Sequence, residues 1–440
     1  MLPSSQSKTS LFASTRFLGW VGWGMAIIVV LAALAWETKQ GFNFSNAHAT
    51  RTVAIRLSSW GSAEEVAQTT ALIRKFEAQH PTVSVQLIHA PEQYMSKLQL
   101  LMATQQTPDV MLMNNLSLPL FAHAKQLRPL QSSLPPAERA LFRPQSLETF
   151  TLNGQLMALP RDVSVLVMYL NTDWLKQAGL PLPKPTWRWQ QEAIPLFQQA
   201  VSHPPQASKN SPHWGVSFYA KPALFWLPFI FSWGGKLPTT PLEAEQFLKP
   251  QSSEIQGLSV YRSLRTPLKL APLASEVGNT SMTELFLQQK IAGLISGRWV
   301  LPALTKQASF HWKILPLPAG GKGSVVGVDA SGYCVSASSP HPTEAVALAQ
   351  FLTSKQAQSV FAKSGLLTPA RIAVPLQADQ AVFLQAIVTG KPTHPPVQWE
   401  AWQDLMVETL LPAFDGQQTV ETATNTPAFR NRQAREVFSP

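Results

Sequence analysis

A chain of 440 residues is longer than one ordinary hydrophobic core, so its length predicts two lobes or domains. Hydrophobic residues make up 45% of the chain and charged residues 14%, which excludes a chain kept disordered by its charge. The formal net charge of +10 is spread without a run of Lys and Arg, so we expect neither a nucleic-acid partner nor an anionic membrane surface.

The first distinct segment, at residues 17–36 (FLGWVGWGMAIIVVLAALAW), carries no charge and follows Lys8 and Arg16. Basic residues before a long apolar stretch are typical of an export signal or of a single transmembrane helix that anchors the chain. Two segments, Ala47-His48-Ala49 and Ala33-Leu34-Ala35, have the small-x-small pattern of a signal-peptidase cleavage site. The alternative is that the apolar segment is not cleaved and remains as a membrane anchor. Either alternative places the rest of the chain in the periplasm or another extracytoplasmic space.

The next elements alternate between strands and helices. Residues 52–60 have the alternating apolar pattern of a strand, and residues 64–79 have helical spacing. A second strand is predicted at 83–90, a second amphipathic helix at 94–106, and a third strand at 108–115. The apolar run of this third strand is typical of a parallel sheet buried on both faces, so the fold class is α/β.

Later segments continue the α/β pattern less clearly. Residues 156–171 (LMALPRDVSVLVMYLN) read as a pair of strands. Helices are predicted near residues 257–264, 281–289 and 343–364.

The order of motifs from Arg51 to the C-terminus carries a family resemblance. The motifs are SSWG, FEAQHPTVSV, YMSKLQLLMATQQTPDVMLMNN, NGQLMALPRDVSVLVMYLNTDWLKQAGLPLPKPTW, FWLPFIFSWGGKL, FLQQKIAGLISGRWVLPAL, LPLPAGGKG, SGYCVSASSPHPTEAVALAQFLTSKQAQSVFAKSG and LTPAR. Together they resemble the extracellular solute-binding proteins of bacterial ABC importers, in the large sugar-binding family that includes maltose-binding and glycerol-phosphate-binding proteins. The chain departs from that family at Gln105-Gln106 and at 289–293, where local turn geometry is expected to differ.

The resemblance implies a two-lobed periplasmic-binding-protein fold, in which crossover hinge strands join the lobes around a ligand cleft. Lobe 1 is expected at residues 50–161 plus 326–365, lobe 2 at 162–325 plus 366–440, and a signal or anchor with its linker at 1–49. The implied function is an exported receptor that captures a saccharide or sugar-like solute and delivers it to an ABC permease. We expect a monomer that closes over its ligand, and no enzyme activity.

A cleft for a neutral sugar needs exposed aromatic planes beside small polar groups. Trp60-Gly61 follows the first strand, and Trp233-Gly234 follows an aromatic stretch, although core packing is an equal alternative for both tryptophans. By resemblance, Trp299 matches a family position for stacking on a sugar, and Trp402 matches a second aromatic residue over the cleft.

Polar candidates follow strand ends, which face the cleft in α/β lobes. They are Asn114, Asn115, Asp162, Ser164, Asp329 and Arg371. Maltose-type relatives have carboxylates where this chain has Ser164 and the neighbourhood of Lys221, which argues against maltodextrin as the ligand. Arginine presents a planar fork to carboxylates and phosphates, so Arg161, Lys221, Arg298 and Arg371 leave an anionic ligand open.

Sequence motifs give little support for catalysis, a metal or a cofactor. The nine histidines include no HExxH motif, and a single cysteine, Cys334, excludes a multi-cysteine zinc site. Residues 327–332 (GVDASG) lack the full GxSxG frame of a nucleophile elbow, and no GxxxxGK[ST] phosphate loop occurs. An exported glycan-acting lyase or hydrolase remains the main alternative, and a cell-surface nucleic-acid binder is the third hypothesis.

Overall fold

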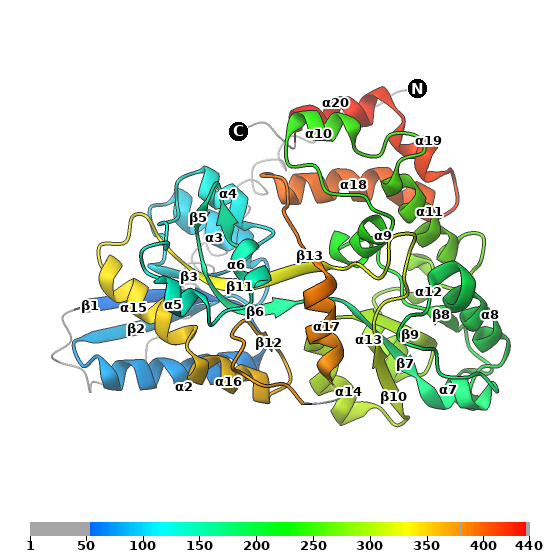
Figure 1. The fold of residues 1–440 in the computed structure, drawn as a ribbon, viewed down its shortest axis with the longest axis horizontal. Coiled ribbons are helices and arrows are strands. Elements are labelled where there is room, and N and C mark those ends of the chain that lie inside the picture. The colour runs from blue at the N-terminus through cyan, green and yellow to red at the C-terminus, as the bar shows by residue number, and fades with distance from the viewer. Residues whose placement is uncertain (1–52, 378–379, 437–440) are drawn as a thin grey trace, which may run out of the picture. The chain divides into compact units, whose positions relative to one another are not determined.

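The computed structural model describes residues 53–377 and 380–436. The predicted signal or anchor at 17–36 and both cleavage patterns lie outside these residues. Among the residues that are described, no helix is long and apolar enough to cross a membrane. The chain from Thr52 onward is one compact unit built on two main β-sheets (Figure 1).

The larger sheet has seven strands, in the order β12-β6-β11-β3-β1-β2 with β13 added on β11. Strands β1, β2 and β3 are parallel, whereas β11 runs antiparallel to both β3 and β6. The strands are β1 (Val53–Ser59), β2 (Val83–His89), β3 (Val110–Asn114), β6 (Leu159–Ser164), β11 (Gly327–Val335), β12 (Thr368–Pro369) and β13 (Lys391–Pro392). This sheet confirms the strands predicted at 52–60, 83–90 and 108–115.

Local sequence signals explain the first α/β unit. The Ser62 hydroxyl accepts a hydrogen bond from Glu65 N, and the Glu65 carboxylate accepts one from Ser62 N, so a capping box starts α2 (Ala63–Gln79). Leu72 and Phe76 are buried on one face of this helix. The helix ends at Gln79, with His80 as its C-cap just before Pro81, which confirms the helix predicted at 64–79.

The smaller sheet has four strands, in the order β10-β7-β9-β8. They are β10 (Trp312–Leu315), β7 (Val167–Asn171), β9 (Ile291–Ser296) and β8 (Trp214–Val216). Aromatic side chains fill the core beside it: the rings of Phe218 and Tyr261 stack 4.2 Å apart, and Phe414 packs edge-on against both. A short hairpin, β4 (Thr151–Leu152) with β5 (Gln155–Leu156), stands apart from both sheets.

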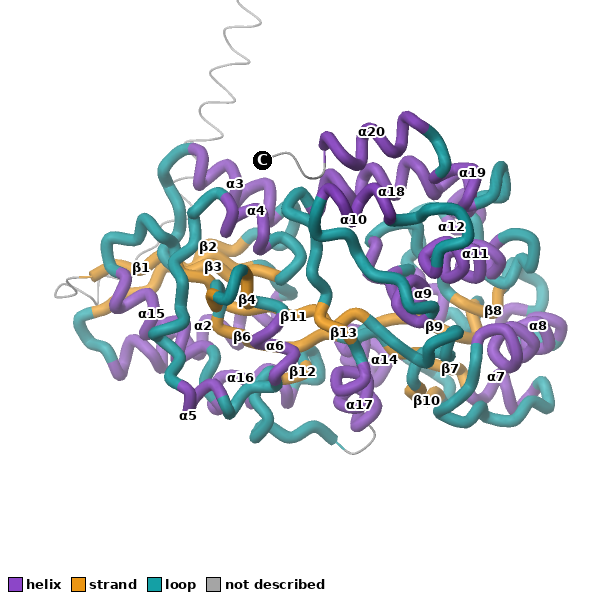
Figure 2. Tube along the Cα trace, turned by 45° about the horizontal axis from the view of Figure 1, so that its top comes forward, coloured by secondary structure: helices purple, strands orange, loops and turns teal. Residues whose placement is uncertain are grey.

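Helices cover both faces of the larger sheet, with α3 and α4 on one side and α2 and α16 on the other (Figures 1 and 2). The helices besides α2 are α3 (Tyr94–Ala103), α4 (Leu118–His123), α5 (Pro136–Arg139), α6 (Pro144–Glu148), α7 (Thr172–Gln177), α8 (Ile194–Ser202), α9 (Leu227–Ser232), α10 (Pro241–Gln246), α11 (Ser253–Arg265), α12 (Ala274–Val277), α13 (Met282–Leu287), α14 (Leu301–Gln307), α15 (Pro342–Leu352), α16 (Lys355–Lys363), α17 (Ala381–Thr389), α18 (Trp399–Phe414), α19 (Val420–Thr424) and α20 (Pro427–Glu436). The single helix predicted at 343–364 is two helices, because Ser354 caps the start of α16 by accepting a hydrogen bond from Ala357 N.

The two sheets are joined by short connections. Strand β6 ends at Ser164 in the larger sheet, and β7 begins at Val167 in the smaller one. The return connection runs from β10 to β11, which begins at Gly327. β13 adds to the start of β11 and leads on to α18.

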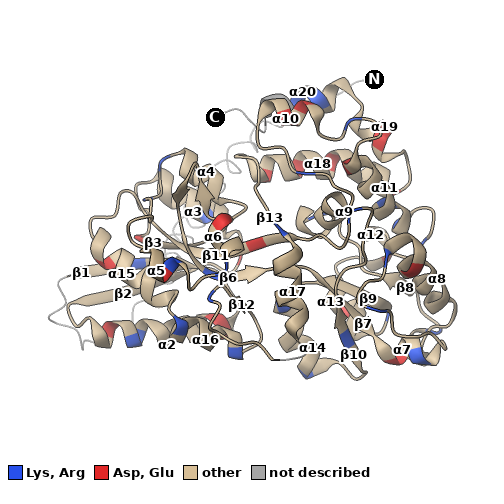
Figure 3. Ribbon diagram, in the orientation of Figure 1, with Lys and Arg blue, Asp and Glu red and all other residues tan. Residues whose placement is uncertain are grey.

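The lobe limits inferred from resemblance stay a prediction. Strand β6 belongs to the larger sheet as far as Ser164, and β12 at 368–369 pairs with it, so this sheet extends past both predicted limits of lobe 1, at 161 and 365. Basic and acidic residues are both scattered over the described elements (Figure 3), in line with a diffuse surface charge.

Candidate functional site

A cavity of about 300 Å³ opens where β6 leaves the larger sheet. Strands β3, β6 and β11 and the first turn of α2 supply most of its polar residues, and turns and loops supply most of its apolar residues. It is lined by Trp60, Glu65, Asn114, Asn115, Leu116, Arg161, Asp162, Ser164, Val165, Leu166, Leu224, Trp299, Asp329, Ala330, Ser331, Leu366 and Leu367. Seven of the twelve residues predicted to bind ligand therefore line one cavity: Trp60, Asn114, Asn115, Asp162, Ser164, Trp299 and Asp329.

The most charged wall of the cavity is a closed network around Arg161. Its Nε donates to Asp162 Oδ2 at 2.9 Å, its Nη2 donates to Ser331 Oγ at 3.0 Å, and its Nη1 lies 3.6 Å from Glu65 Oε1. Asp162 also accepts hydrogen bonds from the backbone N–H and the hydroxyl of Ser331. Burial acts to lower the pKa of Arg161, but the charges of Asp162 and Glu65 contribute to a net rise, so the guanidinium stays charged and paired.

A second polar cluster surrounds Asp329 on β11. Asn115 Nδ2 donates to Asp329 Oδ1 at 3.3 Å and to the Thr393 carbonyl oxygen at 3.0 Å. Burial raises the pKa of Asp329 to about 6, although hydrogen bonding to Thr393 and Asn115 acts to lower it. Asp329 therefore titrates closer to neutrality than an ordinary aspartate.

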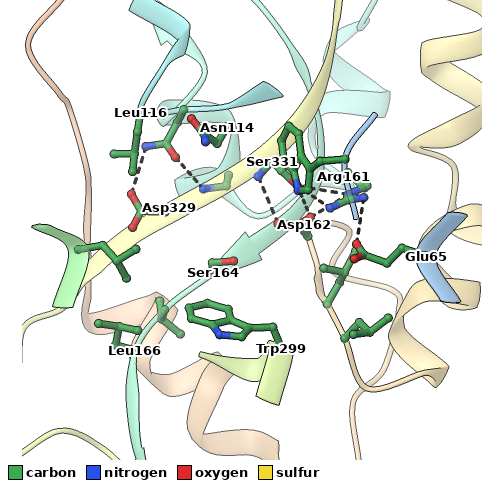
Figure 4. A pocket seen from close by; sticks show the side chains of 17 residues that line it. Glu65, Asn114, Leu116, Arg161, Asp162, Ser164, Leu166, Trp299, Asp329 and Ser331 are labelled. Atoms are coloured by element: carbon green, nitrogen blue, oxygen red, sulfur yellow. Dashed lines mark hydrogen bonds and ion pairs between the residues drawn. The ribbon is translucent and has the colours of Figure 1, made fainter. Parts of the chain in front are cut away.

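Two smaller polar groups have bonding capacity left. Asn114 lines the cavity, and its Oδ1 accepts a hydrogen bond from Ser117 N at 2.8 Å, so its amide NH₂ has no partner among the described residues. Within the described part of the chain, the hydroxyl of Ser164, which lines the cavity, makes no hydrogen bond. In Figure 4, Ser164 lies between the Trp299 indole on one side and Asp162 with Arg161 on the other.

Tryptophans form part of the apolar wall. The side chain of Trp299, in a short turn after β9, is 40% exposed, which is unusual for so large an apolar group. Its ring covers Gly297 so closely that a Cβ atom there would lie 1.8 Å from the ring. Trp60 is half-buried and packs edge-on against Tyr94, with ring centroids 5.0 Å apart. Both rings are thus held in place while they line the cavity.

Five predicted residues lie away from the cavity lining. Gly61 follows Trp60 in sequence but does not line the cavity. The Trp233 ring stacks on Phe229 and covers Gly320. Gly234 adopts a φ of +97° beside Lys322, so its place is a turn that favours glycine.

Trp402, predicted to cover the cleft, is instead completely buried in α18. Its ring lies 5.0 Å from Trp399 and 5.8 Å from Trp226, so an aromatic core holds it. Tryptophan on an amphipathic helix looks the same in sequence whether its face meets core or cleft, and here tertiary packing turns it inward.

Arg371 was predicted to meet a polar ligand group, but its guanidinium contacts other residues of the protein, away from the cavity. Its Nε donates to the Thr353 carbonyl at 2.7 Å, its Nη2 pairs with Glu138 at 3.0 Å, and the group lies over the Phe142 ring. These contacts tie α5 to the end of α15. The position therefore has a structural role that its sequence context did not reveal.

The other candidate cations also have protein partners. Lys221 pairs with Asp404 at 2.5 Å, and Arg298 donates to Gln380 Oε1 at 2.6 Å and to the Ala362 carbonyl at 3.1 Å. Together with Arg161 and Arg371, all four cations named for an anionic ligand are satisfied within the chain. The cavity presents no unpaired cation among its described lining residues.

Sequence reasoning missed one charged residue and several leucines of the lining. Glu65 gave only the signal of a capping box, and its contact with Arg161 joins positions 96 residues apart. The leucines at 116, 166, 224, 366 and 367 carry no signal that separates a cavity wall from a core. Among the described residues, no group of three or more His, Cys, Asp or Glu side chains is placed to hold a metal ion.

Comparison with known proteins agrees with this architecture. Residues 71–383 match the family model of bacterial extracellular solute-binding proteins. A lipoprotein from Streptomyces antibioticus, described as uncharacterized and encoded in the oleD 5' region, is 28% identical over 305 residues. That alignment covers 66% of this chain, and the chain spans 64% of the length of that relative.

Solved structures with the same fold come from several bacteria. The ABC substrate-binding protein Lmo0181 of Listeria monocytogenes, in complex with cycloalternan, superimposes with a TM-score of 0.75 at 17% identity, over 88% of this chain and 100% of that one. The GacH receptor of Streptomyces glaucescens, studied unliganded and with acarbose, gives 0.73 at 18% identity, over 88% and 99%. Maltose-bound MalE3 of T. maritima gives 0.69 at 19% identity, over 88% and 99%.

These matches confirm the family and the fold class expected from the sequence. The family model spans well over half of the chain, and the structural matches extend over nearly the whole described part. The chain belongs to the bacterial extracellular solute-binding proteins and has their two-lobed α/β fold.

Proposed function

We propose that this protein captures an uncharged saccharide or sugar-like solute outside the cytoplasm and delivers it to an ABC import permease. The single observation that carries the proposal is the cavity in which the exposed Trp299 ring faces small polar groups at strand ends. A sugar ring offers an apolar C–H face to an indole and hydroxyls to polar side chains. Relatives solved with cycloalternan, acarbose and maltose support the same ligand class.

The preference for an uncharged solute follows from the internal pairing of the cations. The Arg161 guanidinium is hydrogen-bonded to Asp162 and Ser331 and paired with Glu65, so a phosphate would have to displace those partners to reach it. Asp329 adds a carboxylate that would repel an anion once ionised. Ser164 and Asn114 suit hydroxyl groups, because each has hydrogen-bonding capacity left over.

Binding would shift an equilibrium between open and closed lobes, because only the closed state lets both walls of the cavity contact the solute. The permease would then recognise the closed form, a step that rests on family membership. Stimulation of permease ATPase activity by the liganded protein tests this step in reconstituted vesicles.

The ligand class is tested by thermal shift on the full chain against maltose, maltotriose, sorbitol and glycerol 3-phosphate. A solute at one hundred times its dissociation constant stabilises the folded state by about 2.7 kcal/mol. We expect uncharged solutes to raise the melting temperature and glycerol 3-phosphate not to. Stabilisation by the phosphate alone would overturn the charge argument, and turnover of a saccharide would favour the alternative of a glycan-acting enzyme.

The role of Trp299 is tested by calorimetry on Trp299→Ala with the best solute from that screen. An aromatic anchor at a recognition site contributes about 2 kcal/mol or more, so affinity should fall by well over tenfold. Trp233→Ala is the matched control, because that ring stacks on Phe229 and lies outside the cavity lining. Equal affinity losses in the two variants would remove Trp299 from the site.

A further inference from the structure

Asn115, predicted from sequence to contact ligand, has its amide fully used inside the protein. The side chain is 1% exposed. Its Oδ1 accepts a hydrogen bond from Ala330 N at 3.0 Å, and its Nδ2 donates to Asp329 Oδ1 at 3.3 Å and to the Thr393 carbonyl at 3.0 Å. An amide has two N–H donors, and both are committed here, so little capacity remains for a solute.

The partners of Asn115 belong to segments that lead from one sheet to the other. Asp329 lies opposite Ser164 in the β11–β6 ladder. Ser164 in turn stands three residues before Val167, where β7 begins in the smaller sheet. Thr393 follows β13, and its N–H donates to the Val328 carbonyl before the chain enters α18. One amide at the end of β3 thus holds β11 and the β13–α18 segment together.

We propose that Asn115 is a positioning residue of the hinge, which fixes how the connecting segments lie and thereby sets the equilibrium between open and closed lobes. The inference rests on the proposed function, because a hinge matters only if the lobes close on a solute. Asn115 itself need not touch that solute. Its neighbour Asn114 lines the cavity with an amide NH₂ that has no partner among the described residues, so it keeps the role of a ligand contact under the proposed function.

Asn115→Asp tests the amide with almost no change in shape. The substitution replaces the NH₂ donor by an oxygen that would face Asp329 Oδ1 and the Thr393 carbonyl, so two hydrogen bonds become repulsive contacts. Two carboxylates at hydrogen-bond distance cannot both be ionised easily, and one proton shared between them restores a single bond. Disruption by this variant is therefore expected at alkaline pH and reversed at acidic pH.

Other ionisable groups near the trio have partners of their own. Arg161, Asp162 and Glu65 form the closed network on the other wall of the cavity. His394, next to Thr393, lies 3.5 Å from Glu148. The wild type carries all of these groups, so their effect is removed when its distance-versus-pH profile is subtracted from that of the variant.

The experiment measures a distance across the hinge in the full chain with no solute present. Spin labels are placed on exposed lysines changed to cysteine, Lys75→Cys on α2 and Lys306→Cys on α14, while the native Cys334 is completely buried. At pH 8 we expect N115D to shift the mean distance by more than about 2 Å, the scale of a domain rearrangement. At pH 5 the distance should return toward that of the wild type.

Asn171→Asp is the matched control, because it makes the same change at a buried asparagine outside the cavity lining. Asn171 caps α7 through its Oδ1, an aspartate keeps that cap, and its Nδ2 has no partner. We expect no distance shift in this control. If N115D does not fold, N115S removes the same two donors, and a broadened distance distribution is then the expected result.

An unchanged mean distance at pH 8 in folded N115D, or an unchanged width of the distance distribution in N115S, would overturn the hinge role, as would an equal shift in N171D. Because no solute is added, this outcome does not depend on the sugar screen. The hinge role also predicts that N115D changes the apparent affinity for the screened solute more at pH 8 than at pH 5, since a hinge acts by changing the population that can bind.

Discussion

Replacement of Arg161 by methionine should destabilise the protein strongly, because it leaves a buried carboxylate without its main partner. The Arg161 side chain is 3% exposed, and the carboxylate of Asp162 next to it is 3% exposed. After the substitution, the N–H and hydroxyl of Ser331 are the donors left to Asp162. Breaking a buried ion pair from one side costs about 3–5 kcal/mol.

Compensating contacts do not remove this cost. Methionine can replace part of the packing of Arg161 over the Phe361 ring, whose centroid lies 5.3 Å from the guanidinium carbon, but it supplies no donor. Glu65 loses only a 3.6 Å contact and is partly exposed, so it adds little. We therefore place the loss in the free energy of unfolding near the lower end of that range, at about 3 kcal/mol.

Urea unfolding followed by tryptophan fluorescence measures this loss. The double variant Arg161→Met with Asp162→Asn should recover a large part of it, because the uncompensated charge is then absent. Lys221→Met is the control, since Lys221 and Asp404 form an exposed pair whose removal should change stability by less than about 1 kcal/mol. A loss below about 1 kcal/mol in R161M, or a double variant no more stable than R161M, would refute the reasoning.

Three further predictions concern other parts of the chain. Burial raises the pKa of Asp329 from 3.8 to about 6, so the native state holds this proton more tightly than the unfolded state does. The free energy of unfolding should therefore fall as pH rises from about 4 to 6. Asp329→Asn should flatten that part of a pH–stability profile. Arg371→Ala should lower stability through the lost contacts with Glu138 and Thr353 while solute affinity measured by calorimetry stays unchanged, and a selective loss of affinity would return Arg371 to the site. A chain that starts at Thr50 should elute as a soluble monomer in gel filtration, since the compact unit begins at Thr52; aggregation of the folded truncated chain would count against this.

Much of the fold could be read from local sequence. The capping box of Ser62 and Glu65 marks the start of α2, and the apolar run of β3 marks a strand covered on both faces. The order of such elements, with the motifs between them, was enough to identify the family. The strand pattern predicted that Asn114, Asp162 and Asp329 would gather, and all three line one cavity, although Asp162 lies within β6 and Asp329 near the beginning of β11.

Tertiary structure decided how individual side chains are used. Trp299 and Trp402 were both predicted as cleft aromatics, yet one is 40% exposed and the other 0%, because α18 turns its face into an aromatic core. Asn114 and Asn115 are adjacent, but the side chain of Asn114 accepts a hydrogen bond from nearby Ser117, whereas that of Asn115 bonds to residues more than 200 positions away. Local pattern reports periodicity and strand ends, whereas hydrogen-bond and charge partners come from distant parts of the chain. For that reason the sequence predicted which residues gather around one cavity, and only the folded chain showed which of their polar groups already have partners within the protein.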